Sequence, residues 1–168
     1  MGRKGEGFMK ERIRSLIEQS LQQADEKELK VLEQMLEGYL EKVQGKGTYI
    51  GRIFQLERTT GDHECEVRMP ITGLTSNSLD IVHGGVTATV LDSAMGSAAY
   101  TAAPEGYAVV TSNLTIHYIA PGKGEELTVK ACVLHKGSKT IVVEGKAFRT
   151  DGKKVAHATG TFFLIKRR

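Results

Sequence analysis

The stretch from Asn77 to Tyr100, NSLDIVHGGVTATVLDSAMGSAAY, decides the fold of this chain. It predicts a helix from His83 to Ala103, which ends where Pro104-Glu105-Gly106 breaks the chain. The helix is rich in Ala, Gly and Ser, and such small side chains let another backbone approach closely. In its middle stands Asp92, although aspartate is a poor helix former and is costly to bury without a partner.

The segments on both sides of this helix alternate between apolar and polar residues, which predicts β-strands. A turn at 60–62 joins the first two, and glycine-containing turns separate the others. The predicted strands are 49–57, 63–69, 108–118, 126–135, 140–149 and 154–164. One apolar helix against one antiparallel sheet is an α+β arrangement. A sheet wrapped around this helix would leave its edges free to pair with another chain.

Residues 9–43 read as two helices, and each carries one apolar stripe. Asp25 and Glu28 form a capping-box pattern at the start of the second helix, and Gly45 follows its end. The stripes predict that both helices dock on something, either as a packing appendage or as a regulatory, partner-binding hairpin. The stripe residues are Ile13, Leu16, Ile17 and Leu21, then Leu29, Leu32, Leu36, Tyr39, Leu40 and Val43. The predicted division is a helical extension at 1–46 and a β-rich domain at 47–168.

Composition excludes several classes of protein. The chain of 168 residues has a formal charge of +3, part of it from the last three residues, which gives no reason to expect nucleic-acid binding. It has neither a signal-peptide pattern nor a run long enough to span a membrane, and Cys65 and Cys132 form no CxxC pair. A reducing cytoplasm is the expected location. The histidines lack metal-ligand spacing, and no nucleotide-binding motif is present, so neither metal nor cofactor is expected.

Gly84 and Gly85 open the predicted helix and leave its first N–H groups unshielded. With the helix dipole, such donors can polarise a carbonyl and stabilise an oxyanion. The alternative is that the glycines only permit a tight entry turn. For Asp92, the alternative to a functional role is a solvated surface carboxylate. We expect it on a shallow face of small residues with Gly85, Ala88, Met95, Gly96 and Ala99.

Gly84 and Asp92 are eight residues apart, which is about 12 Å along a helix axis. A general base must lie within about 3 Å of the proton that it takes, or reach it through one water. Asp92 therefore cannot serve a carbonyl held at the start of its own helix. It can serve one held by a second chain across a two-fold axis, which would make the active unit a dimer with two sites.

Four further residues are candidates. Asn77 could hydrogen-bond a substrate or only form a turn, and His83 could cap the helix entry. Thr111 and Ser112 could hold a water or orient a carboxylate, although threonine in a strand is usually only a good strand former.

The pattern Asn77…His83-Gly84-Gly85…Asp92, followed by SNLTIHYIAPGKGEEL, resembles the hotdog-fold acyl-CoA thioesterases. It is most similar to the phenylacetate-pathway and 4-hydroxybenzoyl-CoA types. The resemblance implies a central helix wrapped by an antiparallel sheet, paired into a homodimer or a dimer of dimers (homotetramer). It also implies that the N–H of Gly84 polarises a thioester carbonyl and that Asp92 of the partner chain acts as general base or nucleophile. Asn77 would position the reacting groups, and Thr111 would hold the water or the carboxylate.

The sequence thus predicts a hydrolase that acts on a small, aromatic or medium-chain acyl-CoA, and an acyl-carrier-protein substrate stays open. Catalytic roles fall to Asp92, Gly84, Asn77, His83 and Thr111, and substrate contacts to Gly85 and Ser112. The alternative is a non-catalytic acyl-CoA sensor whose N-terminal helices report ligand binding. A hotdog hydratase ranks last, because it would need a catalytic histidine opposite the acid.

Overall fold

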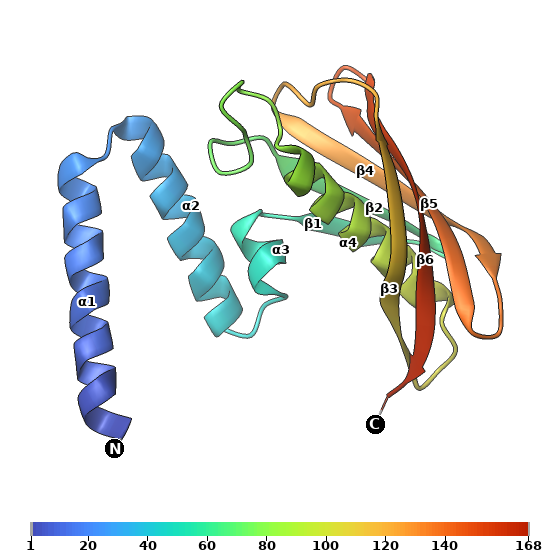
Figure 1. Cartoon of the computed structure of the whole chain (residues 1–168), viewed down its shortest axis with the longest axis horizontal. Coiled ribbons are helices and arrows are strands. Elements are labelled where there is room, and N and C mark those ends of the chain that lie inside the picture. Colours follow the sequence, from blue (N-terminus) through green and yellow to red (C-terminus); the bar gives the residue numbers. More distant parts are fainter. Residues whose placement is uncertain (1, 168) are drawn as a thin grey trace.

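The computed structural model describes residues 2–167. In chain order, its helices are α1 (Gly2–Gln23), α2 (Glu26–Val43), α3 (Tyr49–Ile53) and α4 (Gly84–Ala102). The strands are β1 (Glu57–Thr60), β2 (Glu64–Pro70), β3 (Tyr107–Tyr118), β4 (Glu126–Lys136), β5 (Thr140–Arg149) and β6 (Lys154–Lys166). They form one antiparallel sheet in the order β1-β2-β4-β5-β6-β3, which curves around α4 (Figure 1).

The core lies between α4 and the sheet. Val90, Leu91, Ala94 and Met95 of α4 are fully buried, as are the inward residues of β2, β4 and β5. The helix approaches the sheet closely because two strand residues opposite Met95 are glycines. A Cβ at Gly145 would lie 2.7 Å from Met95 Sδ, and one at Gly160 would lie 2.9 Å from Met95 Cε. Ala94, Ala98 and Ala99 of the opening stretch are fully buried as well, so its small residues serve close packing, as predicted.

Five of the six predicted strands are confirmed, with ends that differ by one or two residues. The strand predicted at 49–57 is wrong. Thr48 caps a short helix there by accepting a hydrogen bond from the N–H of Gly51 at 3.1 Å, and β1 begins only at Glu57. The packing of α3 against α2 explains the difference, because tertiary contacts override a local alternating pattern.

The two predicted N-terminal helices are confirmed, and so is the capping box. The Asp25 side chain accepts from Glu28 N–H, and the Glu28 side chain accepts from Asp25 N–H, both at 2.9 Å. The surface by which α2 docks was not predicted. Gln34 and Gly38 are buried, Gln34 Nε2 donates to the Ile53 carbonyl at 2.8 Å, and a Cβ at Gly38 would strike the Ile53 backbone at 2.6 Å. The apolar stripe of α2 faces elsewhere.

Across residues 2–167, no helix combines the length and the apolar character needed to cross a bilayer.

Candidate active site

The first turn of α4 presents two N–H donors that no described residue accepts, those of Gly84 and Val86. His83 is the N-cap, and its Nδ1 accepts the N–H of Gly85 at 3.0 Å. The Tyr118 hydroxyl donates to the Gly84 carbonyl at 2.8 Å, which ties the helix start to the end of β3. Among residues 2–167, the N–H of Gly84 has no acceptor. Of the two glycine N–H groups, that of Gly84 is therefore free, whereas His83 uses that of Gly85.

Asn77 organises the loop that leads into α4. Its side-chain oxygen accepts from Leu79 N–H at 2.9 Å, and its own N–H donates to the Ile81 carbonyl at 2.9 Å. His83 N–H then donates to the Thr75 carbonyl at 2.9 Å. The loop is thus a closed turn beside the helix start, and the turn-forming alternative for Asn77 describes these contacts.

Asp92 lies half-buried on α4 and is turned toward the edge strand β3 rather than into the core. The Thr111 hydroxyl of β3 donates to Asp92 Oδ1 at 2.8 Å. This contact joins two candidates that are 19 residues apart in the sequence. It gives the carboxylate the partner that a mid-helix aspartate on a packed element needs.

A β-bulge next to Thr111 shapes this contact. Thr111 pairs with Phe162 and Asn113 pairs with Thr161, so Ser112 is the extra residue in β3. The Ser112 hydroxyl donates to the Thr161 carbonyl at 2.9 Å. Bulges often re-aim a neighbouring side chain at a functional site. In this structure, Ser112 closes the bulge, and its predicted substrate contact stays a prediction.

The face expected around Asp92 needs a correction. Met95 and Ala99 are fully buried, so they are not part of an open face around the carboxylate. Gly85, Ala88 and Gly96 are half-buried or exposed, so these three do line the open side of α4. By helix geometry, Met95 points about 60° away from Asp92, whereas Ala99 points in nearly the same direction two turns further along, where the fold covers it.

Asp92 borders a cavity of about 710 Å³ along the second half of α4. The helix forms its floor, and the two outer strands of the curved sheet, β1 and β3, approach it from opposite sides. Sequence reasoning missed its cationic and aromatic members, which lie outside any motif. Its lining includes Arg58, Thr60, Ser93, Ser97, Tyr100, Thr111, Phe162 and Arg167. Arg167 donates to the Tyr100 hydroxyl at 2.9 Å and covers its ring.

The structure does not bring all candidates of one chain together. Gly84, His83 and Asn77 gather at the start of α4, whereas Asp92 and Thr111 meet two turns further along, about 12 Å away by helix geometry. Tyr118 was missed as a member of the first group, because a tyrosine in an alternating strand carries no functional signal of its own. Among the described residues, no three His, Cys, Asp or Glu side chains are placed to hold a metal.

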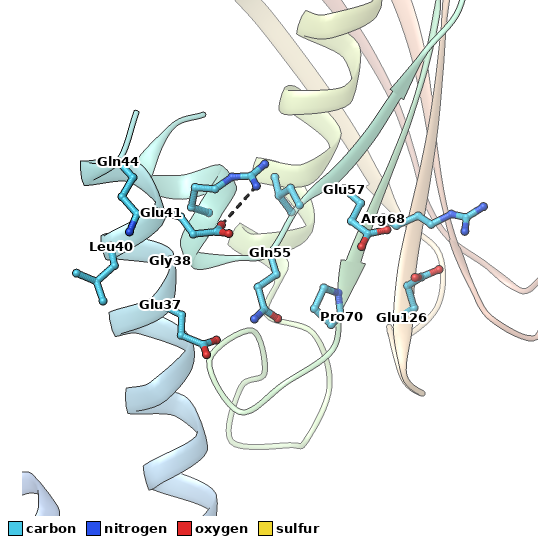
Figure 2. Close-up of a pocket in the computed structure, with 12 residues that line it drawn as sticks. Glu37, Gly38, Leu40, Glu41, Gln44, Gln55, Glu57, Arg68, Pro70 and Glu126 are labelled. Carbon is cyan, nitrogen blue, oxygen red and sulfur yellow. Dashed lines mark hydrogen bonds and ion pairs between the residues drawn. The ribbon is translucent and has the colours of Figure 1, made fainter. Parts of the chain in front are cut away.

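A second cavity, of about 670 Å³, lies between α2 and the β1–β2 edge of the sheet (Figure 2). Glu37, Glu41, Glu57 and Glu126 line it, together with Arg52 and Arg68. Arg52 Nη1 lies 3.4 Å from Glu41 Oε2. No candidate residue borders this cavity, and its excess of carboxylates would repel a phosphate-bearing ligand. The cavity beside Asp92 is the better candidate site.

Known proteins resemble this chain in sequence and in fold. The family model of the thioesterase superfamily matches residues 79–156. Human acyl-coenzyme A thioesterase 13 is 30% identical over 118 residues, which cover 68% of this chain and 81% of that protein. The match spans 62–64% of the length of three further curated relatives, among them mouse acyl-coenzyme A thioesterase 13.

Solved structures of other proteins share the fold of this chain. A Bacillus halodurans protein crystallised with CoA is 41% identical and superimposes with a TM-score of 0.83, over 90% of this chain and 99% of that one. The PaaI protein of Escherichia coli, at 23% identity, shares the fold with a TM-score of 0.67 over 79% of this chain and 96% of its own. The predicted hotdog fold is confirmed, with its central helix, its antiparallel sheet and an N-terminal helical region. The chain belongs to the thioesterase superfamily.

Proposed function

We propose that this chain is an acyl-CoA thioesterase, which hydrolyses a small, aromatic or medium-chain acyl-CoA to the free acid and CoA. The observation that carries the proposal is the Asp92 carboxylate, held by the Thr111 hydroxyl at the border of an open cavity. A carboxylate fixed by one hydrogen bond keeps lone pairs for a water or for the substrate. The acyl-CoA thioesterases among its relatives and the CoA bound to the Bacillus halodurans protein support the same substrate class.

The chemistry requires two groups. The N–H of Gly84 would donate to the thioester oxygen, which becomes an oxyanion when the carbonyl carbon is attacked. Asp92 would take a proton from the attacking water, or attack the carbonyl carbon itself and form an anhydride that water then opens. In the first case, the proton that Asp92 took passes to the sulfur as the C–S bond breaks. In the second case, CoA leaves as the thiolate and takes a proton from solvent, and the water that opens the anhydride gives the free acid and restores the Asp92 carboxylate. Asn77, His83, Gly85 and Ser112 would hold the loop, the helix start and the bulge in place around these groups.

A two-fold homodimer would complete the site. In one chain, the free donor and the carboxylate are too far apart to act on one carbonyl. β3 is an edge strand with an unpaired side, and Val110 and Tyr118 on it are 44% and 55% exposed. Pairing of two β3 edges would bring Gly84 of one chain toward Asp92 of the other. We infer a homodimer or a dimer of dimers on this basis, with the helical extension at 1–46 outside the catalytic domain at 47–168.

The cavity beside Asp92 would receive the acyl group. Its volume of about 710 Å³ falls within the range of small-molecule sites. Its walls combine the Phe162 and Tyr100 rings with hydroxyl groups, which suits acyl groups of moderate length or an aromatic ring. We place the protein in the cytoplasm, where its two cysteines, both free in the structure, would stay reduced.

Thiol release across a panel of acyl-CoAs tests the proposal. A chromogenic thiol reagent would follow wild type, Asp92→Asn and the matched control Asp62→Asn, whose carboxylate is exposed in a turn. Turnover should collapse in Asp92→Asn alone, while the melting temperature and oligomeric mass hold. A protein that binds CoA esters and turns over none of them would instead be the acyl-CoA sensor.

A further inference from the structure

The arm, residues 2–43 with helices α1 and α2, carries an apolar surface that its own domain leaves uncovered. α2 docks through Gln34 and Gly38, which are buried against α3. At about 100° per residue, the centre of its apolar stripe lies on the opposite side of the helix. Of the stripe side chains, Leu36, Tyr39, Leu40 and Val43 are 38–60% exposed, whereas Leu29 and Leu32 are half-buried. The domain therefore docks mainly on the side of α2 opposite the stripe, although the Tyr49 ring of α3 stacks on Tyr39 at the edge of the stripe.

α1 repeats this pattern. Five of its large apolar side chains are 49–74% exposed, and Ile17 is half-buried. The five are Phe8, Met9, Ile13, Leu16 and Leu21. In Figure 1, α1 stands outside α2, away from the sheet, and the two helices diverge from the corner at Ala24–Asp25. An open wedge of about 440 Å³ separates them next to this corner, lined by Ala24, Glu28 and Val31 among others. Soluble proteins rarely leave apolar stripes of this length open unless a partner covers them.

The corner between the helices is built rigidly. The reciprocal hydrogen bonds of Asp25 and Glu28 fix the first turn of α2, and Ala24 N–H still donates to the Ser20 carbonyl as part of α1. Only two residues separate the helices. This corner directs α1 away from α2 of the same chain and leaves both stripes open to a partner from outside the chain.

The net charges of α1 and α2 indicate which partner covers the stripes. α1 carries five basic and three acidic residues, a net charge of +2. α2 carries three basic and five acidic residues, a net charge of −2. The two helices are thus complementary in charge, and each presents an apolar stripe.

We propose that the arm is a self-association surface, in which α1 of one chain packs its apolar stripe on the stripe of α2 of a second chain. In this arrangement, each helix meets an apolar stripe and a net charge of the opposite sign on the second copy. An anionic membrane surface fits less well, because the net-negative α2 would be repelled from it. The proposal goes beyond the proposed function, since these stripes contain no residue of the candidate site.

Cross-linking between full-length chains tests it, in a Cys132→Ala background that leaves only the buried Cys65. One chain carries Leu16→Cys and the other, with a tag, carries Leu36→Cys, and a short bis-maleimide is added to the mixture. The expected product is a cross-linked pair of one chain of each kind. Adding Ile13→Glu should lower its yield about tenfold or more, because a carboxylate would enter an apolar contact. The matched control Gln22→Glu puts the same charge on the opposite side of α1 and should leave the yield unchanged.

Three outcomes would overturn the proposal. Cross-links that form only inside a chain carrying both cysteines would mean that the arm closes on itself. No cross-link of either kind would mean that no copy covers the stripe. Co-sedimentation with phosphatidylglycerol-containing vesicles, without cross-linked pairs, would assign the arm to a membrane surface. Asp92→Asn should leave the cross-link intact, so that failure of the proposed hydrolase and failure of this proposal are distinguishable.

Discussion

At the scale of single residues, the contact between Thr111 and Asp92 carries most of the functional argument. The sequence placed both residues among the candidates, but only the fold brings them to 2.8 Å. No spacing rule connects position 92 on a helix with position 111 on a strand. The bulge at Ser112, which shapes the contact, is also invisible in a strand pattern.

Thr111→Val should lower kcat/KM for the best acyl-CoA by about tenfold to a hundredfold, the usual cost of a lost hydrogen bond to a charged group. Valine has the shape of threonine and lacks the hydroxyl that holds Asp92 Oδ1. Thr111→Ser, which keeps a donor, is the matched control and should retain most of the activity. Equal rates for wild type and Thr111→Val would mean that this contact does not orient the carboxylate.

Glu144 gives a prediction for stability against pH. The Lys146 ammonium, and next the His157 imidazole at 2.9 Å, hold the pKa of this carboxyl below its usual range. Because the folded pKa is lowered, the stabilisation is present above the unfolded value of about 4.3 and is lost as pH falls through the folded value. Glu144→Gln should therefore lower the melting temperature at pH 7, and the gap to wild type should close as pH falls below the unfolded value. A gap that widens on acidification would contradict this sign.

At the scale of elements, α4 has one role in the candidate site and another in the core, and a single substitution tests each role. Its first turn supplies the free N–H of Gly84. Gly84→Pro removes this donor at a position where proline suits a helix, and His83 before it already has an extended ψ of 136°. We expect a folded protein with kcat lowered about a hundredfold.

Gly84→Ala is the control, because it keeps the N–H and its Cβ would meet the Tyr118 ring at an ordinary 3.7 Å. It should stay close to wild type in kcat. If the proline and alanine variants lose activity equally while both keep their melting temperature, the donor is not the reason.

The packing face of α4 gives a stability prediction. Gly145→Ala would place a Cβ 2.7 Å from Met95 Sδ and 3.1 Å from Leu91 Cδ2 in a fully buried layer. Overpacking of this kind costs about 1–3 kcal/mol in the free energy of unfolding. Urea denaturation would measure it against Gly61→Ala, where the new Cβ would meet only Glu64 at 3.8 Å. Equal urea midpoints for the two variants would show that Met95 and Leu91 move aside without a loss of stability.

Most elements of the domain were predictable from the sequence, but the short helix at residues 49–53 was not. The α4 helix and five strands were predictable because long periodic segments agree with their burial. Residues 49–53 were not, because their alternating pattern is overruled by the contact of Ile53 with Gly38, a packing partner that no local pattern encodes.

At the scale of the whole molecule, the candidate site and the arm both point to more than one chain. Asp92 and Gly84 each have a defined local role, yet helix geometry keeps them about 12 Å apart in one chain. The sequence could predict this separation, because it depends only on helix rise. It could not predict the open cavity beside Asp92 or the outward stripes of the arm, since both depend on which surfaces the fold covers.

The measurement that tests the central claim most directly mixes two inactive variants. Chains with Asp92→Asn and chains with Gly84→Pro are unfolded, refolded together in equal amounts and assayed for thiol release. If each site combines Gly84 of one chain with Asp92 of the other, half of the dimers are hybrids with one intact site, and about a quarter of wild-type activity should return. Hybrids that form with their fold intact and recover no activity would contradict the shared site.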